Sequence, residues 1–354
     1  MILSSLSLQN FRSYSKAKFS FDPHLTIIVG PNASGKTNLV EAVSLLSTGK
    51  SFRTSKEKQV ISFGETMARI SSEVLELSEA TKVEVVVSDM PGQMFKKYFI
   101  NGVSKRRASL AGLVPVVLFT PLDLDLVSGQ PGSKRRFLDE VLEQTDQEYA
   151  AALLLYSKAL RQRNALLEFV QKTGRRDAER FSYWDNLLIS NGQRVTEKRE
   201  ALIAYINTQE KQLFPFMLTY DKSVISHERL LQYKDAEIGA GVTLVGPQRD
   251  DVMIQSKHPI SKELEDAKYF CSRGQQRLVA LELKKSQISY LQKQLQTQPL
   301  LVLDDIFSEL DGEHIKQVLH LTHDFQTIIT TTHKEFIDAD IGKDKAVIEL
   351  EENS

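Results

Sequence analysis

The sequence has a single cysteine, almost no net charge and no long run of apolar residues, and each shortage excludes a class of protein. One thiol, Cys271, rules out an internal disulfide framework and a cysteine-rich zinc site. Without a run of about 18 apolar residues a transmembrane helix is not expected, and the first residues lack the basic start and apolar core of a signal peptide. The formal charge of -1 means that any nucleic-acid binding must rest on local basic clusters. We therefore expect a cytoplasmic protein without a membrane partner.

The order of apolar patterns along the chain predicts a split α/β lobe with a helical lobe inserted into it. Short apolar runs typical of strands fill residues 1–130 and return in residues 241–354. Between them, residues 134–171 and 178–213 have apolar side chains at intervals of three and four, which predicts two long helices within an insert of residues 131–240. These helices are too short and too weak in heptad order for a long coiled coil.

Residues 30–37 read Gly-Pro-Asn-Ala-Ser-Gly-Lys-Thr and fit the G-x-x-x-x-G-K-T pattern of a phosphate-binding loop. An apolar strand precedes the loop and a helical pattern follows it, so backbone N–H groups at the start of the helix can bind a phosphate. Lys36 would reach the β and γ phosphates, and Thr37 would present its hydroxyl to Mg²⁺. We expect ATP and Mg²⁺ as ligands, with the nucleotide held by Gly30, Pro31, Asn32, Ala33, Ser34, Gly35, Lys36, Thr37 and Asn38.

A second apolar run, residues 300–303, is followed by the paired carboxylates Asp304 and Asp305, which resembles a Walker B strand. Asp304 would hold Mg²⁺, and Asp305 would act as general base toward the attacking water. The alternative is a strand that ends in two acidic turn residues. The presence of Lys36 favours the catalytic interpretation.

Upstream of that strand, Ser272, Gly274 and Gln275 stand before a strongly helical run and resemble the signature motif of ABC-type ATPases. In those proteins this helix start faces the ATP of the partner subunit, so two chains would enclose two ATP molecules. The alternative is an ordinary helix N-cap. Two later residues complete the ABC pattern: Asp311 resembles the D-loop residue at the dimer interface, and His333 resembles the switch histidine. A surface histidine is the alternative for His333, which we place with Lys36 and Asp305 in the catalytic set.

Several further segments resemble the RecF family of DNA-repair ATPases, within the SMC/Rad50-like group. Residues 8–14 match its L-x-N-F-R-x-Y start, in which the arginine, here Arg12, lies near the nucleotide. Residues 119–139 resemble its connection into the helical lobe, and residues 243–251 resemble its G-P-x-R-D-D element. Two departures are Ala33, where the family often has a second loop glycine, and Gln248, where it often has histidine. The resemblance implies an ABC-type P-loop ATPase head with an inserted helical lobe.

The same resemblance implies a function: an ATP-dependent homodimer that clamps DNA next to single-strand gaps and helps mediator proteins to load a recombinase. ATP hydrolysis would be slow and would act as a switch. DNA contacts would be to phosphates. Three basic clusters are the candidates for these contacts: Lys50, Arg53, Lys56 and Lys58; Lys105, Arg106 and Arg107; Arg175 and Arg176. Each cluster could instead be a solvated loop. The rival functions are an ABC transport ATPase subunit and a DNA scaffold that binds ATP without hydrolysing it.

Overall fold

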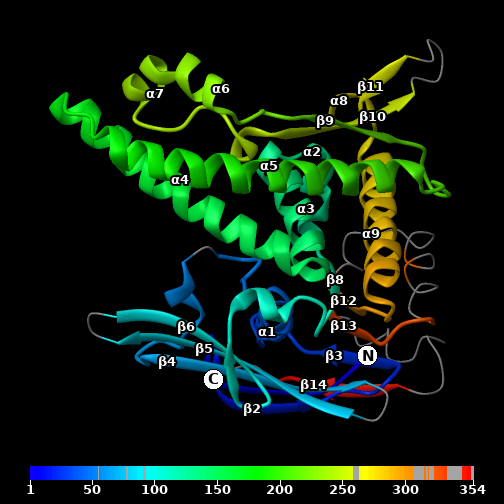
Figure 1. The fold of residues 1–354 in the computed structure, drawn as a ribbon. Helices are drawn as coiled ribbons and strands as arrows, with labels where there is room; N and C mark the ends of the chain where they lie inside the picture. Colours follow the sequence, from blue (N-terminus) through cyan, green and yellow to red (C-terminus); the bar gives the residue numbers. More distant parts are fainter. Residues whose placement is uncertain are drawn as a thin grey trace. The chain divides into compact units, whose positions relative to one another are not determined.

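The computed structural model describes residues 1–54, 56–76, 79–90, 93–257, 263–305, 315, 318, 323–332 and 345–351, and element labels follow Figure 1. The chain divides into two compact units. Unit 1 contains Met1–Asp123 and Gln287–Ser354, and unit 2 contains Leu124–Ser286. The sequence placed the end of the insert at residue 240, whereas the compact unit extends to residue 286, because β10 (Asp251–Lys257) pairs with β9 (Met217–Asp221) of unit 2.

A five-stranded parallel sheet forms the centre of unit 1. Its strands are ordered β14 (Ala346–Glu349), β3 (Leu25–Val29), β13 (Thr327–Thr331), β12 (Leu300–Asp304) and β8 (Val116–Phe119). Every residue of β3, β12 and β13 is buried. Burial explains the largely apolar sequences of β3 and β12, whereas β13 carries three threonines. Because all five strands are parallel, the carboxyl ends of β3, β13 and β12 meet at one edge of the sheet.

A six-stranded antiparallel sheet is the second layer of unit 1 (Figure 1). Its order is β2 (Tyr14–Ser20), β1 (Ile2–Phe11), β4 (Met67–Glu76), β5 (Glu79–Met90), β6 (Gln93–Ile100) and β7 (Val103–Lys105). Buried and exposed positions alternate along β4, as expected when one face packs on the core and the other faces solvent. Short 3-10 turns, η1 (Glu57–Val60), η2 (Arg107–Leu110) and η3 (Pro121–Leu124), connect these elements.

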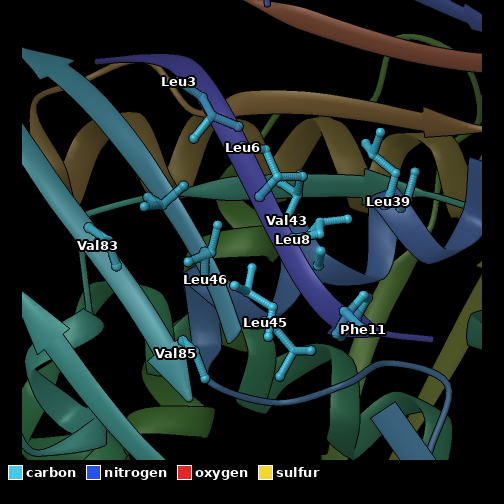
Figure 2. Close-up of a cluster of buried hydrophobic side chains, with 14 of the residues drawn as sticks. Leu3, Leu6, Leu8, Phe11, Leu39, Val43, Leu45, Leu46, Val83 and Val85 are labelled. Atoms are coloured by element: carbon cyan, nitrogen blue, oxygen red, sulfur yellow. The ribbon is translucent and has the colours of Figure 1, made fainter. Parts of the chain in front are cut away.

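Helix α1 (Lys36–Thr48) packs into the core of unit 1. Its leucines and valines join side chains of β1 and β5 in one buried cluster. Figure 2 shows this cluster, with labels on Leu3, Leu6, Leu8, Phe11, Leu39, Val43, Leu45, Leu46, Val83 and Val85. Each fully buried leucine in such a cluster contributes roughly 1.5–3 kcal/mol. The helix ends at Gly49, whose φ of 72° is a left-handed C-cap. This packing fixes the helix that follows the phosphate loop.

Unit 2 is built on two long helices, α4 (Gln147–Thr173) and α5 (Ala178–Thr208). The sequence predicted a single helix over residues 134–171, whereas the structure divides this range between α3 (Pro131–Thr145) and α4, because Asp146 has an extended backbone conformation and caps α4. Asp146 and Asp177 cap their N-termini by accepting backbone N–H groups. The other elements are α2 (Asp125–Ser128), α3 (Pro131–Thr145), β9, α6 (His227–Gln232), α7 (Lys234–Ala240), η4 (Pro247–Arg249), β10, β11 (Leu264–Asp266), α8 (Ala267–Phe270) and α9 (Arg273–Leu295), whose last residues belong to unit 1. Among the helices that the structure describes, none has the length and hydropathy to cross a bilayer.

A buried polar network in unit 2 involves the carboxylate of Asp250, within residues 246–251. Arg199 is 3% exposed and donates to Asp139 at 2.8 Å and to Asp250 at 3.1 Å. Asp250 is fully buried and also accepts the backbone N–H of Ser223 at 2.7 Å. The network therefore ties α3, α5 and the turn before β10 together. A buried charge is stable only where donors surround it in this way.

Gln248 takes part in the same turn. Its Oε1 accepts the hydroxyl of Tyr156, and its Nε2 donates to the carbonyl of Val245 at 2.9 Å. At Gly246, where φ is 116°, a Cβ would lie 2.5 Å from the hydroxyl oxygen of Tyr156. The amide thus supplies one acceptor and one donor, which shows how glutamine fits at this position.

We predict that Arg199→Leu destabilises unit 2 by about 3–5 kcal/mol, because it leaves buried carboxylates without their cation. Trp184 is the only tryptophan of the chain and packs against the buried cluster of α4 and α5, so its fluorescence reports unfolding of unit 2. The control is Lys222→Met, which breaks the exposed Lys222–Glu200 pair and should cost less than about 1 kcal/mol. If urea unfolding shows the same loss of unfolding free energy in Arg199→Leu and Lys222→Met, the stabilising role of the network is contradicted.

Candidate active site

The phosphate loop joins β3 to α1, and two of its residues have a left-handed backbone conformation. Gly35 has a φ of 100° and Ala33 a φ of 65°. At Gly35 a Cβ would lie 2.7 Å from the hydroxyl oxygen of Tyr14, and at Gly30 it would lie 2.7 Å from the carbonyl oxygen of Leu350. Both glycines are therefore required by close contacts. Ala33 adopts a conformation that costs a residue with a Cβ about 1 kcal/mol, so the loop tolerates strain where a glycine would relieve it.

Lys36 lies at the start of α1 and is 7% exposed. Its ammonium donates to the carbonyl oxygens of Gly30 at 2.7 Å and Pro31 at 2.8 Å. Burial lowers the pKa of Lys36 from its ordinary value, and the nearby carboxylates of Asp305 and Asp304 oppose that shift. The loop thus holds a cation on its inner side, where a phosphate would meet it.

Asp304 is the last residue of β12, and its carboxylate accepts hydrogen bonds from two hydroxyl groups. Thr330 of β13 donates to its Oδ1 at 2.7 Å, and Thr37 of α1 lies 3.3 Å from the same oxygen. Burial raises the pKa of Asp304, and the hydrogen bonds from Thr330 and Thr37 counteract the rise. The Thr37 hydroxyl at the start of α1 and the Asp304 carboxylate at the end of β12 are hard oxygen ligands. They fit Mg²⁺, which keeps waters and phosphate oxygens as its other ligands.

Sequence reasoning missed Thr330. It is fully buried in the middle strand between β3 and β12. The signal was available in the run Thr327–Thr331, where threonines occupy positions of a buried parallel strand that apolar residues normally fill. A buried hydroxyl needs a partner, and here the partner is the carboxylate of Asp304.

Asp305 directly follows β12 and has a φ of 50°. Its backbone N–H donates to the carbonyl of Thr330 at 3.1 Å and also reaches the Thr330 hydroxyl at 3.2 Å. Arg12 has a φ of 54°, so left-handed non-glycine residues occur on three segments around this edge of unit 1: Arg12, Ala33 and Asp305. Strained backbone of this kind gathers where the surrounding structure holds a functional geometry.

Arg12 contacts α1 rather than open space. Its Nε and Nη2 donate to the two carboxylate oxygens of Glu41 at 2.8 Å and 2.6 Å, and its Nη1 donates to the carbonyl of Gln59 at 2.6 Å. Glu41 is fully buried and also accepts the hydroxyl of Ser51. The sequence predicted Arg12 near the nucleotide; the structure places its guanidinium in a bidentate pair that supports the helix after the phosphate loop.

Arg53 belongs to a basic cluster that the sequence suggested for DNA. In the structure its Nη1 donates to the side-chain oxygen of Asn38 at 2.8 Å and lies 3.6 Å from Glu41. Asn38 in turn donates to the hydroxyl of Ser13 at 2.9 Å. Arg53 therefore faces α1, and its charge helps to lower the pKa of Asp304 against the effect of burial.

The signature-like residues lie in unit 2, at the start of α9. Ser272 Oγ accepts the backbone N–H of Gln275 at 3.3 Å, and Gln275 Oε1 accepts the backbone N–H of Ser272 at 2.8 Å. This reciprocal pair is a capping box. Ser272, Gly274 and Gln275 are exposed, so the helix start is open to a ligand. Asp311 and His333 lie outside the residues that the structure describes.

Comparison with known proteins gives a consistent result. Residues 2–349 match the family described as RecF/RecN/SMC N terminal domain. The chain is 36% identical over 342 residues to the DNA replication and repair protein RecF of Moorella thermoacetica, which covers 93% of this chain and 90% of that protein. It is 35% identical over 346 residues to the protein of the same name from Agathobacter rectalis, covering 94% and 92%.

Solved structures agree with this relationship. The structure of the recombination mediator protein RecF with ATP, in the RecFOR pathway, has a TM-score of 0.85 and 27% identity, and covers 100% of this chain and 96% of that one. An Smc head domain from Pyrococcus furiosus shares the fold, with a TM-score of 0.52, 18% identity and coverage of 99% and 94%. The predicted ATPase-head fold is confirmed, and the chain belongs to the RecF/RecN/SMC family.

Proposed function

We propose that this chain is a cytoplasmic ATPase of recombinational repair and replication that binds DNA as an ATP-dependent homodimer. The dimer would clamp DNA near single-strand gaps and help mediator proteins to load a recombinase. Relatives named for DNA replication and repair, and as a recombination mediator, support this proposal. The observation that carries it is the meeting of Lys36, Thr37 and Asp304 at one edge of the parallel sheet.

The residues at this edge have separate chemical tasks. The Lys36 ammonium is hydrogen-bonded to the carbonyl oxygens of Gly30 and Pro31. When ATP binds, the ammonium would contact the β and γ phosphates instead. Thr37 and Asp304 would hold Mg²⁺, which supplies positive charge against the charge that develops on the transferred phosphate. Asp305 would orient the attacking water and accept its proton.

The exposed start of α9 supports the dimer. Free N–H groups at a helix start bind anions, and the Ser272 capping box fixes this helix start. We infer that Ser272 and Gly274 bind the γ phosphate of ATP held by the partner chain. Hydrolysis would remove this bridge and reopen the clamp. A transport subunit would use the same site, but family membership favours repair.

Two substitutions separate nucleotide binding from dimer formation. Lys36→Met should weaken ATP binding about 10- to 150-fold, the equivalent of a charge-assisted hydrogen bond worth about 1.5–3 kcal/mol. Ser272→Arg should leave ATP binding by the single chain within about twofold and abolish only the dimer, because its contact is to the partner's nucleotide. Calorimetric titration at low protein concentration measures the first effect. Strong loss of single-chain ATP binding in Ser272→Arg would contradict the proposed division.

Asp305→Asn tests the general base. We expect hydrolysis to slow about 100-fold or more while ATP binding persists, because the amide cannot take the proton from water. Single-turnover hydrolysis with bound ATP gives the rate of the chemical step. Unchanged turnover would exclude Asp305 as the base and favour another base, whereas the absence of hydrolysis in the wild type would favour the non-hydrolysing scaffold.

Ala33→Gly should relieve the left-handed strain of the loop and leave the stability of unit 1 unchanged or raise it by up to about 1 kcal/mol. The matched control is Ala42→Gly, inside α1, which should cost about 1 kcal/mol. Amide hydrogen exchange in the buried strands β3 and β12 reports the free energy of opening. If both glycine substitutions lower the free energy of opening by the same amount, the backbone at Ala33 is not strained.

A further inference from the structure

The solvent-facing side of the antiparallel sheet in unit 1 carries a shallow groove that the nucleotide site does not use. Residues of β1, β2 and β4 line about 330 Å³ of space: Ser7, Leu8, Gln9, Lys16, Ala17, Lys18, Arg69 and Ser71. Strand register sets their order, since Gln9 lies opposite both Lys16 and Arg69. Side chains directly opposite on neighbouring strands share a face. A row of polar side chains therefore crosses three strands at this point.

That row continues across the sheet. Arg69 lies opposite Val86, and Val86 lies opposite Lys97. Lys16, Arg69 and Lys97 are exposed, so three cations occupy one row over five strands. The parallel row next to it, about 7 Å away along the strands, contains Lys18 opposite Ser7. The face therefore presents positive charge in a line rather than at a single point.

Little negative charge neutralises the groove. Arg69 pairs with Glu84 at 3.1 Å, and the Arg69 side chain remains 45% exposed. Within the part of the chain that the structure describes, Lys16 and Lys18 have no ion-pair partner. Three cations thus line the groove, with Glu84 paired to one of them and Glu73 farther along the same face of β4.

We propose that this groove binds the phosphate backbone of duplex DNA, an inference that rests on the proposed function and adds a contact surface to it. Lysine and arginine side chains, together with the hydroxyls of Ser7 and Ser71 and the amide of Gln9, are donors of the kind that contact phosphate oxygens. None of the lining residues is aromatic, so the groove lacks the stacking platforms on which single-stranded nucleic acids bind. Its two apolar lining residues offer no exposed large side chain for insertion into a lipid surface.

The test is the salt dependence of duplex binding with ATP and Mg²⁺ present. The groove variant combines Lys16→Gln, Lys18→Gln and Arg69→Gln. It should reduce the slope of log affinity against log salt by about 3, because each lost phosphate contact removes about 0.9. Between 50 and 200 mM salt, the wild-type affinity should then fall about 40 times more than that of the variant. Retained ATP binding shows that the variant is folded.

The matched control removes the same charge from exposed positions of α4 and α5 in unit 2, through Lys158→Gln, Arg161→Gln and Arg194→Gln. Its slope should stay near that of the wild type. Glu84→Gln should change the slope in the opposite direction. It removes the carboxylate that pairs with Arg69, so Arg69 can contact a phosphate and the slope should rise by up to about 1. A purely structural role for the groove would not produce this gain.

The outcomes separate the two proposals. If wild type binds ATP but no DNA, the proposed function fails and the groove assignment fails with it. If wild type binds duplex and the groove variant keeps the wild-type slope, only the groove assignment is overturned. Equal reductions of the salt slope in the groove and control variants would show a general charge effect and overturn the proposal. Binding to phosphatidylserine vesicles that depends on the groove, without loss of duplex binding in the variant, would assign the face to a membrane and also overturn it.

Discussion

The hydrogen bond between Thr330 and Asp304 is the contact on which the site depends. The parallel register of β12 and β13 places these residues opposite one another, and β13 also pairs with β3, from which the phosphate loop emerges. A carboxylate in a buried environment needs donors, and the central strand supplies one. Because side chains alternate along a strand, a shift of one residue in this register would turn the hydroxyl away from Asp304. Thr37 of α1 lies 3.3 Å from the same oxygen.

The β1–β2 hairpin supplies a second support. At its turn, Arg12 binds Glu41 of α1, and the Tyr14 hydroxyl donates to the carbonyl of Gly35 at 3.1 Å. Burial raises the pKa of Tyr14 to about 12, so the phenol remains a donor. The β1–β2 hairpin thus supports the C-terminal end of the phosphate loop and the helix α1 that follows it. One hairpin therefore serves nucleotide binding and, in our proposal, DNA binding.

The sequence was sufficient for features that rest on neighbouring residues. The turn between β3 and α1, the apolar strand before Asp304 and helix α5 are local patterns, and each occurs at the expected place. Thr330 and Glu41 escaped prediction because their partners lie 26 and 29 residues away along the chain. The end of the insert differed for a similar reason, since the pairing of β10 with β9 is not encoded in the pattern of either strand alone. Ser272 forms a capping box with Gln275 at the start of α9, and in our proposal the same exposed helix start binds an anion.

The central claim is that ATP held by Lys36 and Thr37 joins two chains around DNA. The most direct measurement is the mass of the purified protein in solution, with ATP and Mg²⁺, with and without a gapped duplex. We expect a monomer without nucleotide and a dimer with ATP that retains the gapped duplex. A protein that remains monomeric with ATP and leaves the duplex free would contradict it.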